Sequence, residues 1–93
     1  MVTLEWDERK RQANLAKHGI DFAALDVMFF SNLLEDDDTR REYGERRIKA
    51  IGELNGVIVS VVYTWRGGRR RLISARRARA DERKEYEAKL AAG

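Results

Sequence analysis

Three stretches in the second half of the chain combine alternating apolar positions with many β-branched and aromatic residues, which suit a pleated sheet. They span residues 46–54, 57–66 and 69–77. Asn55-Gly56 and Gly67-Gly68 separate them, and both dipeptides tolerate the positive φ angles that two-residue hairpin turns require. The pattern predicts a meander of three antiparallel strands.

Such turns place residue 54 opposite 57 and residue 66 opposite 69, so that alternate residues share a face. One predicted face is apolar and would pack on the core: Ile48, Ala50, Gly52, Leu54, Val57, Val59, Val61, Tyr63, Trp65 and Leu72, with Arg70 and Arg76 at its margins. The other predicted face holds Arg47, Lys49, Ile51, Glu53, Ile58, Ser60, Val62, Thr64, Arg66, Arg69, Arg71, Ile73, Ala75 and Arg77. Its six basic side chains indicate either a solvated surface or a surface for an anionic partner.

Two helices are predicted before this sheet. Asp7 is a typical N-cap for a helix of about ten residues that stops at Gly19, and His18 then lies in the last turn, as a capping rather than a catalytic residue. Asp21 would cap a second helix over 22–30, with its apolar side on the sheet. The short link between them predicts a tight αα-hairpin.

The remaining segments give weaker signals. Residues 3–6 suit an extra edge strand, and residues 39–45 suit a loop. The acidic run over 35–38 indicates an exposed loop or a charged first strand rather than a metal site. Residues 78–90 predict a final helix whose thin apolar side would dock weakly.

Length and composition favour one domain over residues 1–93, of the α+β class. The chain has no Cys and a single His, which excludes disulfides and thiolate sites and argues against a zinc site or a two-histidine ribonuclease. We expect no metal and no cofactor. No apolar run approaches the ~18 residues of a membrane span and the N-terminus does not resemble a signal peptide, so the expected location is the cytoplasm.

Charge is distributed unevenly along the chain. Residues 1–45 carry 6 basic and 11 acidic side chains, whereas residues 46–84 carry 12 basic and 3 acidic ones. The predicted sheet therefore belongs to a strongly basic half, which favours a nucleic acid or an acidic protein as the partner.

Several short motifs together resemble the BrnT toxin family. They are Trp6-Asp7, Lys17-His18-Gly19-Ile20-Asp21-Phe22, Tyr43-Gly44-Glu45-Arg46, Val62-Tyr63-Thr64, Ile73-Ser74-Ala75-Arg76-Arg77-Ala78, Glu82-Arg83 and Tyr86-Glu87. The resemblance implies a RelE-like fold, with an N-terminal two-helix hairpin packed on a curved antiparallel meander and a C-terminal helix. It also implies a type II toxin–antitoxin system and an endoribonuclease that arrests translation. The implied partner is a BrnA-type antitoxin with a ribbon-helix-helix domain that binds operator DNA, in a hetero-oligomer.

RNA can be cleaved without a metal when its own 2′-hydroxyl attacks the adjacent phosphate. The protein must then hold the backbone in line and stabilise negative charge, which Arg and Lys can do. The predicted catalytic residues are Lys49, Arg66, Arg77 and Glu45, and the predicted RNA-binding residues are Arg47, Arg69, Arg71, Arg76 and Trp65. Arg76 comes from the resemblance, although the predicted register points it to the core face. Arg77→Ala is accordingly expected to weaken RNA handling more than stability.

Other assignments stay open at this level. Glu53, Tyr63 and Tyr86 are further acid–base candidates, but Tyr63 is more readily a core residue, and Trp65 more readily a core rim than a base-stacking platform. The alternative function is an inactive basic module that acts with its antitoxin as a DNA-binding autorepressor. A third reading is an interaction domain for an acidic protein.

Overall fold

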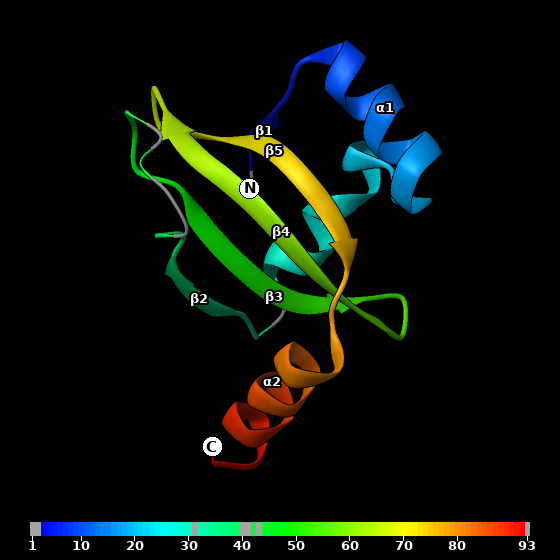
Figure 1. The fold of residues 1–93 in the computed structure, drawn as a ribbon, viewed down its shortest axis with the longest axis vertical. Coiled ribbons are helices and arrows are strands. Elements are labelled where there is room, and N and C mark those ends of the chain that lie inside the picture. Colours follow the sequence, from blue (N-terminus) through cyan, green and yellow to red (C-terminus); the bar gives the residue numbers. More distant parts are fainter. Residues whose placement is uncertain (1–2, 31, 40–41, 43, 93) are drawn as a thin grey trace.

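The fold is α+β, as the sequence predicts, with helices on both faces of one curved sheet (Figure 1). The computed structural model describes residues 3–30, 32–39, 42 and 44–92. In chain order the elements are β1 (Leu4–Glu5), α1 (Glu8–His18), the 3-10 helix η1 (Phe22–Phe30), β2 (Leu34–Asp37), β3 (Ile48–Leu54), β4 (Val57–Arg66), β5 (Arg69–Arg77) and α2 (Ala80–Ala92). No helix in these ranges is long and apolar enough to cross a membrane.

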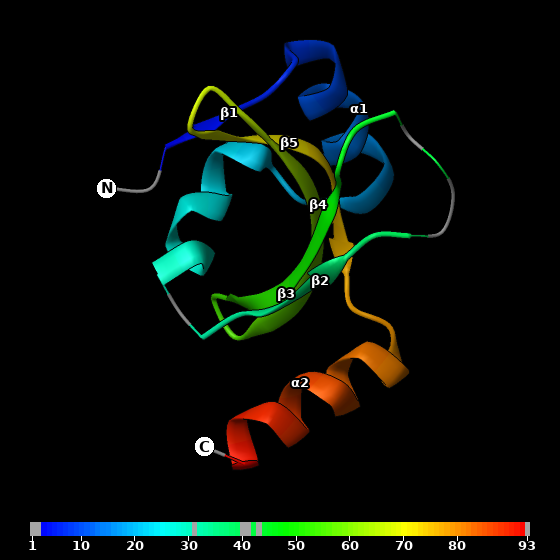
Figure 2. The same ribbon diagram turned by 90° about the vertical axis from the view of Figure 1, so that its left-hand side faces the viewer.

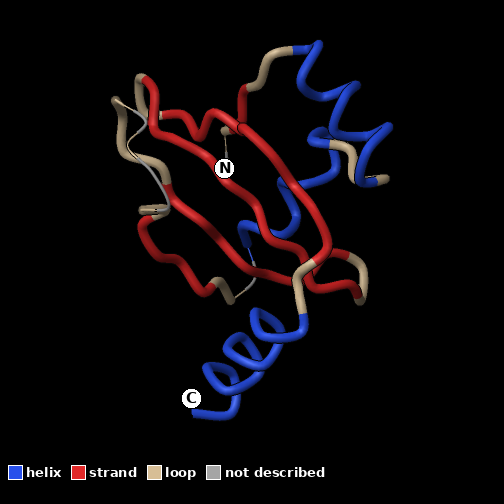
Figure 3. The backbone as a smooth tube through the Cα atoms, in the orientation of Figure 1, coloured by secondary structure: helices blue, strands red, loops and turns tan. Residues whose placement is uncertain are grey.

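The five strands form one sheet in the order β1-β5-β4-β3-β2 (Figure 3). The pairs from β2 to β5 are antiparallel, which confirms the predicted meander, whereas β1 runs parallel to β5. The predicted extra edge strand is therefore present, and it makes the sheet mixed rather than purely antiparallel. The acidic run forms β2 at the opposite edge, where its charges discourage pairing with other chains.

Both predicted hairpin turns are confirmed. Asn55 and Gly56 have φ angles of 49° and 83°, and Gly67 and Gly68 have φ angles of 58° and 78°. Two successive positive φ angles are the signature of the tight turn that matches strand twist. Leu54 consequently faces Val57 and Arg66 faces Arg69, as predicted.

The predicted register is wrong beyond Leu72, because β5 contains a bulge. Tyr63 pairs with Leu72, but Val62 pairs with Ser74, which leaves Ile73 as an extra residue. One inserted residue moves every following side chain to the opposite face. Ala75 therefore lies in the core beside Val61, although it was predicted on the basic face. Arg76 and Arg77 exchange faces in the same way.

The core lies inside the curve of the sheet, where η1 packs (Figure 2). Phe22, Leu25 and Met28 of η1 are fully buried. At Gly52 a Cβ would come within 2.8 Å of the Leu33 side chain and 3.1 Å of the Met28 side chain. The absence of a side chain on β3 thus lets η1 approach the strand closely.

The two N-terminal helices have the predicted ends, and η1 packs its apolar side on the sheet as predicted, but η1 is not of the predicted type. Asp7 accepts hydrogen bonds from the Arg9 and Lys10 amides, and Gly19 closes α1 with a φ of 71°. Asp21 caps η1 by accepting from the Ala23 amide, but η1 is a 3-10 helix rather than an α-helix. Moreover, α1 packs on β5 while η1 packs on β3. The two helices touch each other across their short link, but the predicted tight hairpin of two α-helices is not confirmed.

A buried asparagine fastens α1 to the bulged strand. The Asn14 amide nitrogen donates to the Ala75 carbonyl at 2.9 Å and to the Ile20 carbonyl at 3.0 Å, and its oxygen accepts from the Ala75 amide at 3.0 Å. Asn14 thus satisfies backbone groups of β5 in the way that a neighbouring strand would.

Asn14→Ala is expected to destabilise the protein by roughly 2–3 kcal/mol, because it leaves a buried amide and carbonyl of Ala75 without their partner. Urea denaturation monitored by circular dichroism measures this change. Gln12→Ala, on the exposed side of the same helix, is the control. Equal midpoints for the two variants would contradict the clamping role of Asn14.

The last helix, α2, packs against the outer face of the sheet, opposite η1 (Figure 2). Its Tyr86 joins Ile51 and Ala78 in a small apolar cluster and donates a hydrogen bond from its hydroxyl to the Asn32 carbonyl at 2.8 Å. Within α2 only Glu82 and Tyr86 are buried, which confirms the thin apolar side. Tyr86 is thus a packing residue, not one aimed at open sheet surface.

Candidate functional site

A cleft of about 220 Å³ lies on the outer face of the sheet, between β2 and the start of α2. Its lining includes Lys49 of β3, Ser60 and Val62 of β4, and Ser74 and Arg76 of β5. The full set, here called the sheet cleft, is Asp37, Asp38, Thr39, Lys49, Ser60, Val62, Ser74, Arg76 and Arg79. The bulge at Ile73 is what turns Arg76 toward this cleft, and it resolves the conflict between resemblance and predicted register.

Glu82 holds the basic side chains of the sheet cleft together. Its side chain is 2% exposed, and its two oxygens accept from the two terminal nitrogens of Arg76 at 2.7 and 3.0 Å. Lys49 Nζ donates to the same carboxylate at 3.3 Å. Arg79 adds a guanidinium contact at 3.4 Å and a backbone amide that donates at 2.8 Å.

These contacts keep Glu82 ionised. Burial by itself would raise the pKa of Glu82, but the hydrogen bonds from Arg76 and the Arg79 amide outweigh burial and lower the pKa to about 2. A carboxyl group with such a pKa is a poor proton acceptor near neutral pH. Glu82 is therefore suited to positioning Arg76 and Lys49 rather than to moving protons.

The arrangement presents fixed hydrogen-bond donors to an anion. The side chains of Lys49 and Arg76 are still 30% and 28% exposed, so both reach the open side of the cleft. Glu82 sets their orientation in advance, and cations held in place in this way suit the stabilisation of developing negative charge. The guanidinium fork of Arg76 suits phosphate geometry in particular.

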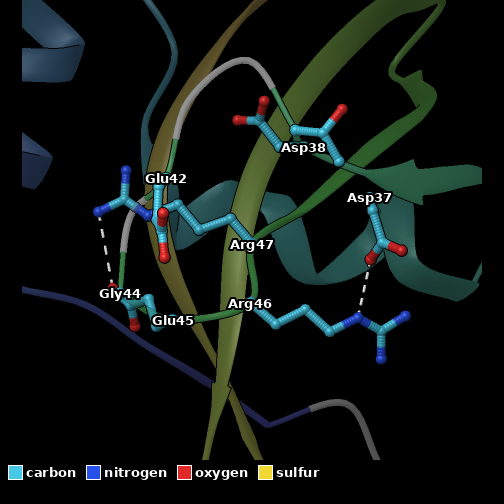
Figure 4. A pocket seen from close by; sticks show the side chains of 8 residues that line it. Asp37, Asp38, Glu42, Gly44, Glu45, Arg46 and Arg47 are labelled. Atoms are coloured by element: carbon cyan, nitrogen blue, oxygen red, sulfur yellow. Dashed lines mark hydrogen bonds and ion pairs between the residues drawn. The ribbon is translucent and has the colours of Figure 1, made fainter.

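A second hollow, here called the loop cleft, adjoins the first. Its volume is about 640 Å³, and its lining is Asp37, Asp38, Thr39, Glu42, Gly44, Glu45, Arg46 and Arg47. Figure 4 shows the two arginines directed to opposite sides, with Arg46 paired to Asp37 at 2.7 Å and Arg47 to Glu45 at 3.6 Å. The predicted site residues Glu45 and Arg47 thus lie here, one cleft away from Lys49. Tyr43, which is part of the family motif, lies outside the described residues.

A third hollow, the aromatic cleft, opens at the other face of the sheet beside Trp65 and Arg70. Arg70 stacks over Phe29 and Trp65, with its guanidinium carbon 4.6 and 4.7 Å from their ring centres. Trp65 is 49% exposed, which confirms a position at the rim of the core. RNA binding by Trp65 stays a prediction.

Tyr63 is a core residue. It is 1% exposed and packs edge-on against Phe29. Its hydroxyl donates a hydrogen bond to Glu35. Burial, together with this carboxylate, raises the pKa of Tyr63. The reading of Tyr63 as core is confirmed, and the side chain points away from the sheet cleft.

The other predicted site residues do not join Lys49 and Arg76. Arg66 and Arg69 are exposed at the turn between β4 and β5, and Arg71 forms an ion pair with Glu5 at 3.7 Å. Arg77 pairs with Val59 and lies in a separate groove beside Ala78. The prediction that Arg77 lies on the basic face is wrong. The structure therefore gives no reason to expect that Arg77→Ala weakens RNA handling more than stability.

Sequence reasoning missed Glu82, Arg79, Ser60 and Ser74 as members of the site. A signal for Glu82 was nevertheless present. Arg79 precedes the first residue of α2, and Glu82 occupies the third helical position, where a Glu side chain returns to the N-cap amide. This capping position, three residues after Arg79, could have identified Glu82 as a carboxylate held close to the arginines of the cleft.

The fold and the sheet cleft define a small α+β protein with preorganised cations on one sheet face. A family model described as "Ribonuclease toxin, BrnT, of type II toxin-antitoxin system" matches residues 6–82. The chain belongs to this BrnT family, and membership of a type II system implies an antitoxin partner. The match includes Lys49, Arg76 and Glu82 but ends there, so most of α2 lies beyond it.

A solved structure supports the assignment. The chain resembles the crystal structure of the ribonuclease toxin BrnT of Brucella abortus, with a TM-score of 0.64 and 35% sequence identity, over 85% of this chain and 99% of the Brucella chain. A comparison with curated proteins finds no match. Among the described residues, no three His, Asp or Glu side chains gather in a way that could hold a metal ion.

Proposed function

We propose that this chain is a metal-independent endoribonuclease toxin that binds an RNA phosphate in the sheet cleft. One observation carries the proposal: Glu82 holds Arg76 and Lys49 side by side at the cleft, and both remain partly exposed. A phosphate placed there meets the partly exposed guanidinium of Arg76 and the ammonium group of Lys49 at once. The family description as a ribonuclease toxin agrees with this chemistry.

In the proposed reaction the RNA 2′-hydroxyl oxygen attacks the adjacent phosphorus, and the bond to the 5′-oxygen breaks. The leaving 5′-oxygen takes up a proton from water, so the products are a 2′,3′-cyclic phosphate and a 5′-hydroxyl end. Arg76 and Lys49 stabilise the extra negative charge on the phosphorane oxygens. Glu45 is the proposed proton acceptor, since the loop cleft and the sheet cleft share Asp37, Asp38 and Thr39 as a common wall. Arg47, Arg69, Arg71 and Trp65 are proposed to contact RNA outside the reacting phosphate.

The proposed biological role follows from the family. Cleavage of RNA in the cytoplasm would arrest translation, and a BrnA-type antitoxin with a ribbon-helix-helix domain would neutralise the toxin in a hetero-oligomer. We further propose that the whole chain acts as one domain and that its fold is of the RelE-like type. Regulated expression of the chain with and without its antitoxin, with growth and RNA integrity followed together, tests this role.

The reaction itself is tested with purified protein and a defined single-stranded RNA in excess EDTA. Cleavage is expected to persist undiminished, and the 5′-fragment is expected to end in a 2′,3′-cyclic phosphate. Mass spectrometry of the fragments identifies that end. Cleavage that disappears in EDTA and returns with added Mg²⁺ would refute the metal-independent mechanism.

One observation also favours the alternative of an inactive basic module that represses its own operon with the antitoxin. In the free chain the carboxylate of Glu82 already occupies the donors that a phosphate would need. Under this alternative the protein with its antitoxin binds operator DNA, while the free protein leaves RNA intact. The same EDTA assay, run beside an operator-binding assay, separates the two functions.

A further inference from the structure

A fourth hollow, here called the helix cleft, lies between α1 and the bulge of β5. Its volume is about 250 Å³, and its lining is Lys10, Ala13, Asn14, Lys17, His18, Ile73 and Ser74. Ser74 also lines the sheet cleft. The two hollows are therefore neighbours that share Ser74, one toward α2 and the other toward α1.

The charge of the helix cleft differs from that of its neighbours. Carboxylates line the sheet, loop and aromatic clefts, but no carboxylate is among the described residues that line the helix cleft. Lys10 and Lys17 are exposed, and neither forms an ion pair with a described acidic side chain. By contrast, Arg11 on the same helix is held by Glu8 and Asp21. The ammonium groups of Lys10 and Lys17 are therefore available to donate hydrogen bonds to a ligand.

The position of these lysines relative to Arg76 is fixed by the fold. Asn14 lies between them on α1 and hydrogen-bonds to both backbone groups of Ala75, the residue before Arg76. Ser74 and Arg76 are two residues apart on β5, which corresponds to roughly 7 Å along a strand. That distance is of the order of one backbone step in a single-stranded nucleic acid. A strand whose phosphate lies at Arg76 can therefore continue over Ser74 to α1.

We propose that the helix cleft is a second phosphate subsite, in which Lys10 and Lys17 bind the RNA backbone one or more nucleotides away from the phosphate at Arg76. The inference rests on the proposed function and extends it. It assigns the bound strand a path from Arg76 toward α1, and it gives a role to a basic helix that belongs to the acidic half of the sequence. The C-terminal carbonyls of α1 repel anions, and the ammonium group of Lys17 in the last turn offsets that repulsion.

The test compares the double variant Lys10→Gln/Lys17→Gln with the matched control Arg9→Gln/Lys84→Gln. Both remove two exposed positive charges, but Arg9 and Lys84 line neither cleft. Binding is measured by fluorescence anisotropy with uniformly 2′-O-methylated oligonucleotides, which lack the attacking hydroxyl. Strands of about 4 and about 12 nucleotides lie at the lower end and in the upper part of the range of site sizes for compact single-strand-binding folds, about 4–16 nucleotides.

For the longer strand, Lys10→Gln/Lys17→Gln is expected to weaken binding roughly tenfold at moderate salt and to lower the slope of log K against log salt by about 1.4. The shorter strand, which fills the sheet cleft alone, should bind both variants equally. Equal losses for the variant and its control, or no loss for either, would overturn the proposal. Unchanged RNA binding with weakened antitoxin binding would make the helix cleft a protein interface instead.

Failure of the proposed function gives a different result. In that case the unmodified protein binds neither oligonucleotide and cleaves no RNA, whatever the variants do. If the unmodified protein cleaves RNA but Lys10→Gln/Lys17→Gln behaves like its control, the proposed function of the sheet cleft is supported and only the proposed second subsite is refuted.

Discussion

Arg76→Ala is expected to slow RNA cleavage by roughly 10²- to 10³-fold, the loss typical of removing one preorganised donor to a transition-state anion. The reason is geometric: Arg76 faces the sheet cleft and is oriented by two hydrogen bonds to Glu82. Arg76→Lys keeps the charge but not the planar fork, so it should recover only part of the rate. Single-turnover cleavage of a defined RNA, at saturating protein, measures the effect on the chemical step.

Two comparisons make this result decisive. Arg83→Lys removes an exposed guanidinium outside the sheet cleft and serves as the control for Arg76→Lys. Arg77→Lys tests the assignment that the sequence alone suggested. A larger rate loss for Arg77→Lys than for Arg76→Lys would mean that the functional face is not the one that the bulge creates. Circular dichroism at the assay temperature establishes that each variant is folded.

Glu82→Gln is expected to have the largest effect on stability. Lowering the pKa of Glu82 from 4.5 to about 2 on folding corresponds to roughly 3 kcal/mol of free energy of unfolding near neutral pH. A glutamine keeps the shape of the side chain but not the charge that Arg76, Lys49 and Arg79 bind. Urea denaturation at pH 7 should therefore show a loss of about that size, whereas Glu85→Gln, exposed on the same helix, should show little.

The pH dependence gives this prediction its sign. The folded protein holds the Glu82 carboxylate more tightly deprotonated than the unfolded chain does, so the stabilisation is complete above pH 4.5. It is lost as the pH falls from 4.5 toward 2, where the proton binds in both states. The difference between the unmodified protein and Glu82→Gln should shrink over that interval. A difference that stays constant down to pH 3 would show that charge is not its origin.

The parts of the fold that depend on neighbouring residues could be predicted from the sequence. Asn55-Gly56 and Gly67-Gly68 specify their turns by backbone conformation alone, and Asp7 and Gly19 mark the ends of α1 by local hydrogen bonds. These signals gave the three central strands and the pairing at both turns. Lys49 was placed correctly for the same reason, because β3 and β4 pair without interruption.

The parts that failed depend on contacts between distant residues. Nothing in the order of residues 72–74 announces a bulge, and the Ala75 groups beyond it are satisfied by Asn14, which is 61 residues away in the chain. One unpaired residue was enough to assign Arg76 and Arg77 to the wrong faces. The type of η1 also escaped prediction, because 3-10 helices longer than about three or four residues are uncommon and a nine-residue apolar run with a capping aspartate favours an α-helix.

Glu82 at the start of α2 and an anion in the sheet cleft would compete for the same Arg76 guanidinium. In the free chain Arg76 binds the carboxylate that also closes the first turn of α2 through the Arg79 amide. Under the proposed function, a phosphate bound in the sheet cleft would compete with that carboxylate for Arg76, and the helix start would lose part of its electrostatic support. By thermodynamic reciprocity, a change that breaks the contact between Arg76 and Glu82 at the start of α2 would strengthen anion binding by the same coupling free energy. The C-terminal helix would then respond to the state of the cleft through Glu82.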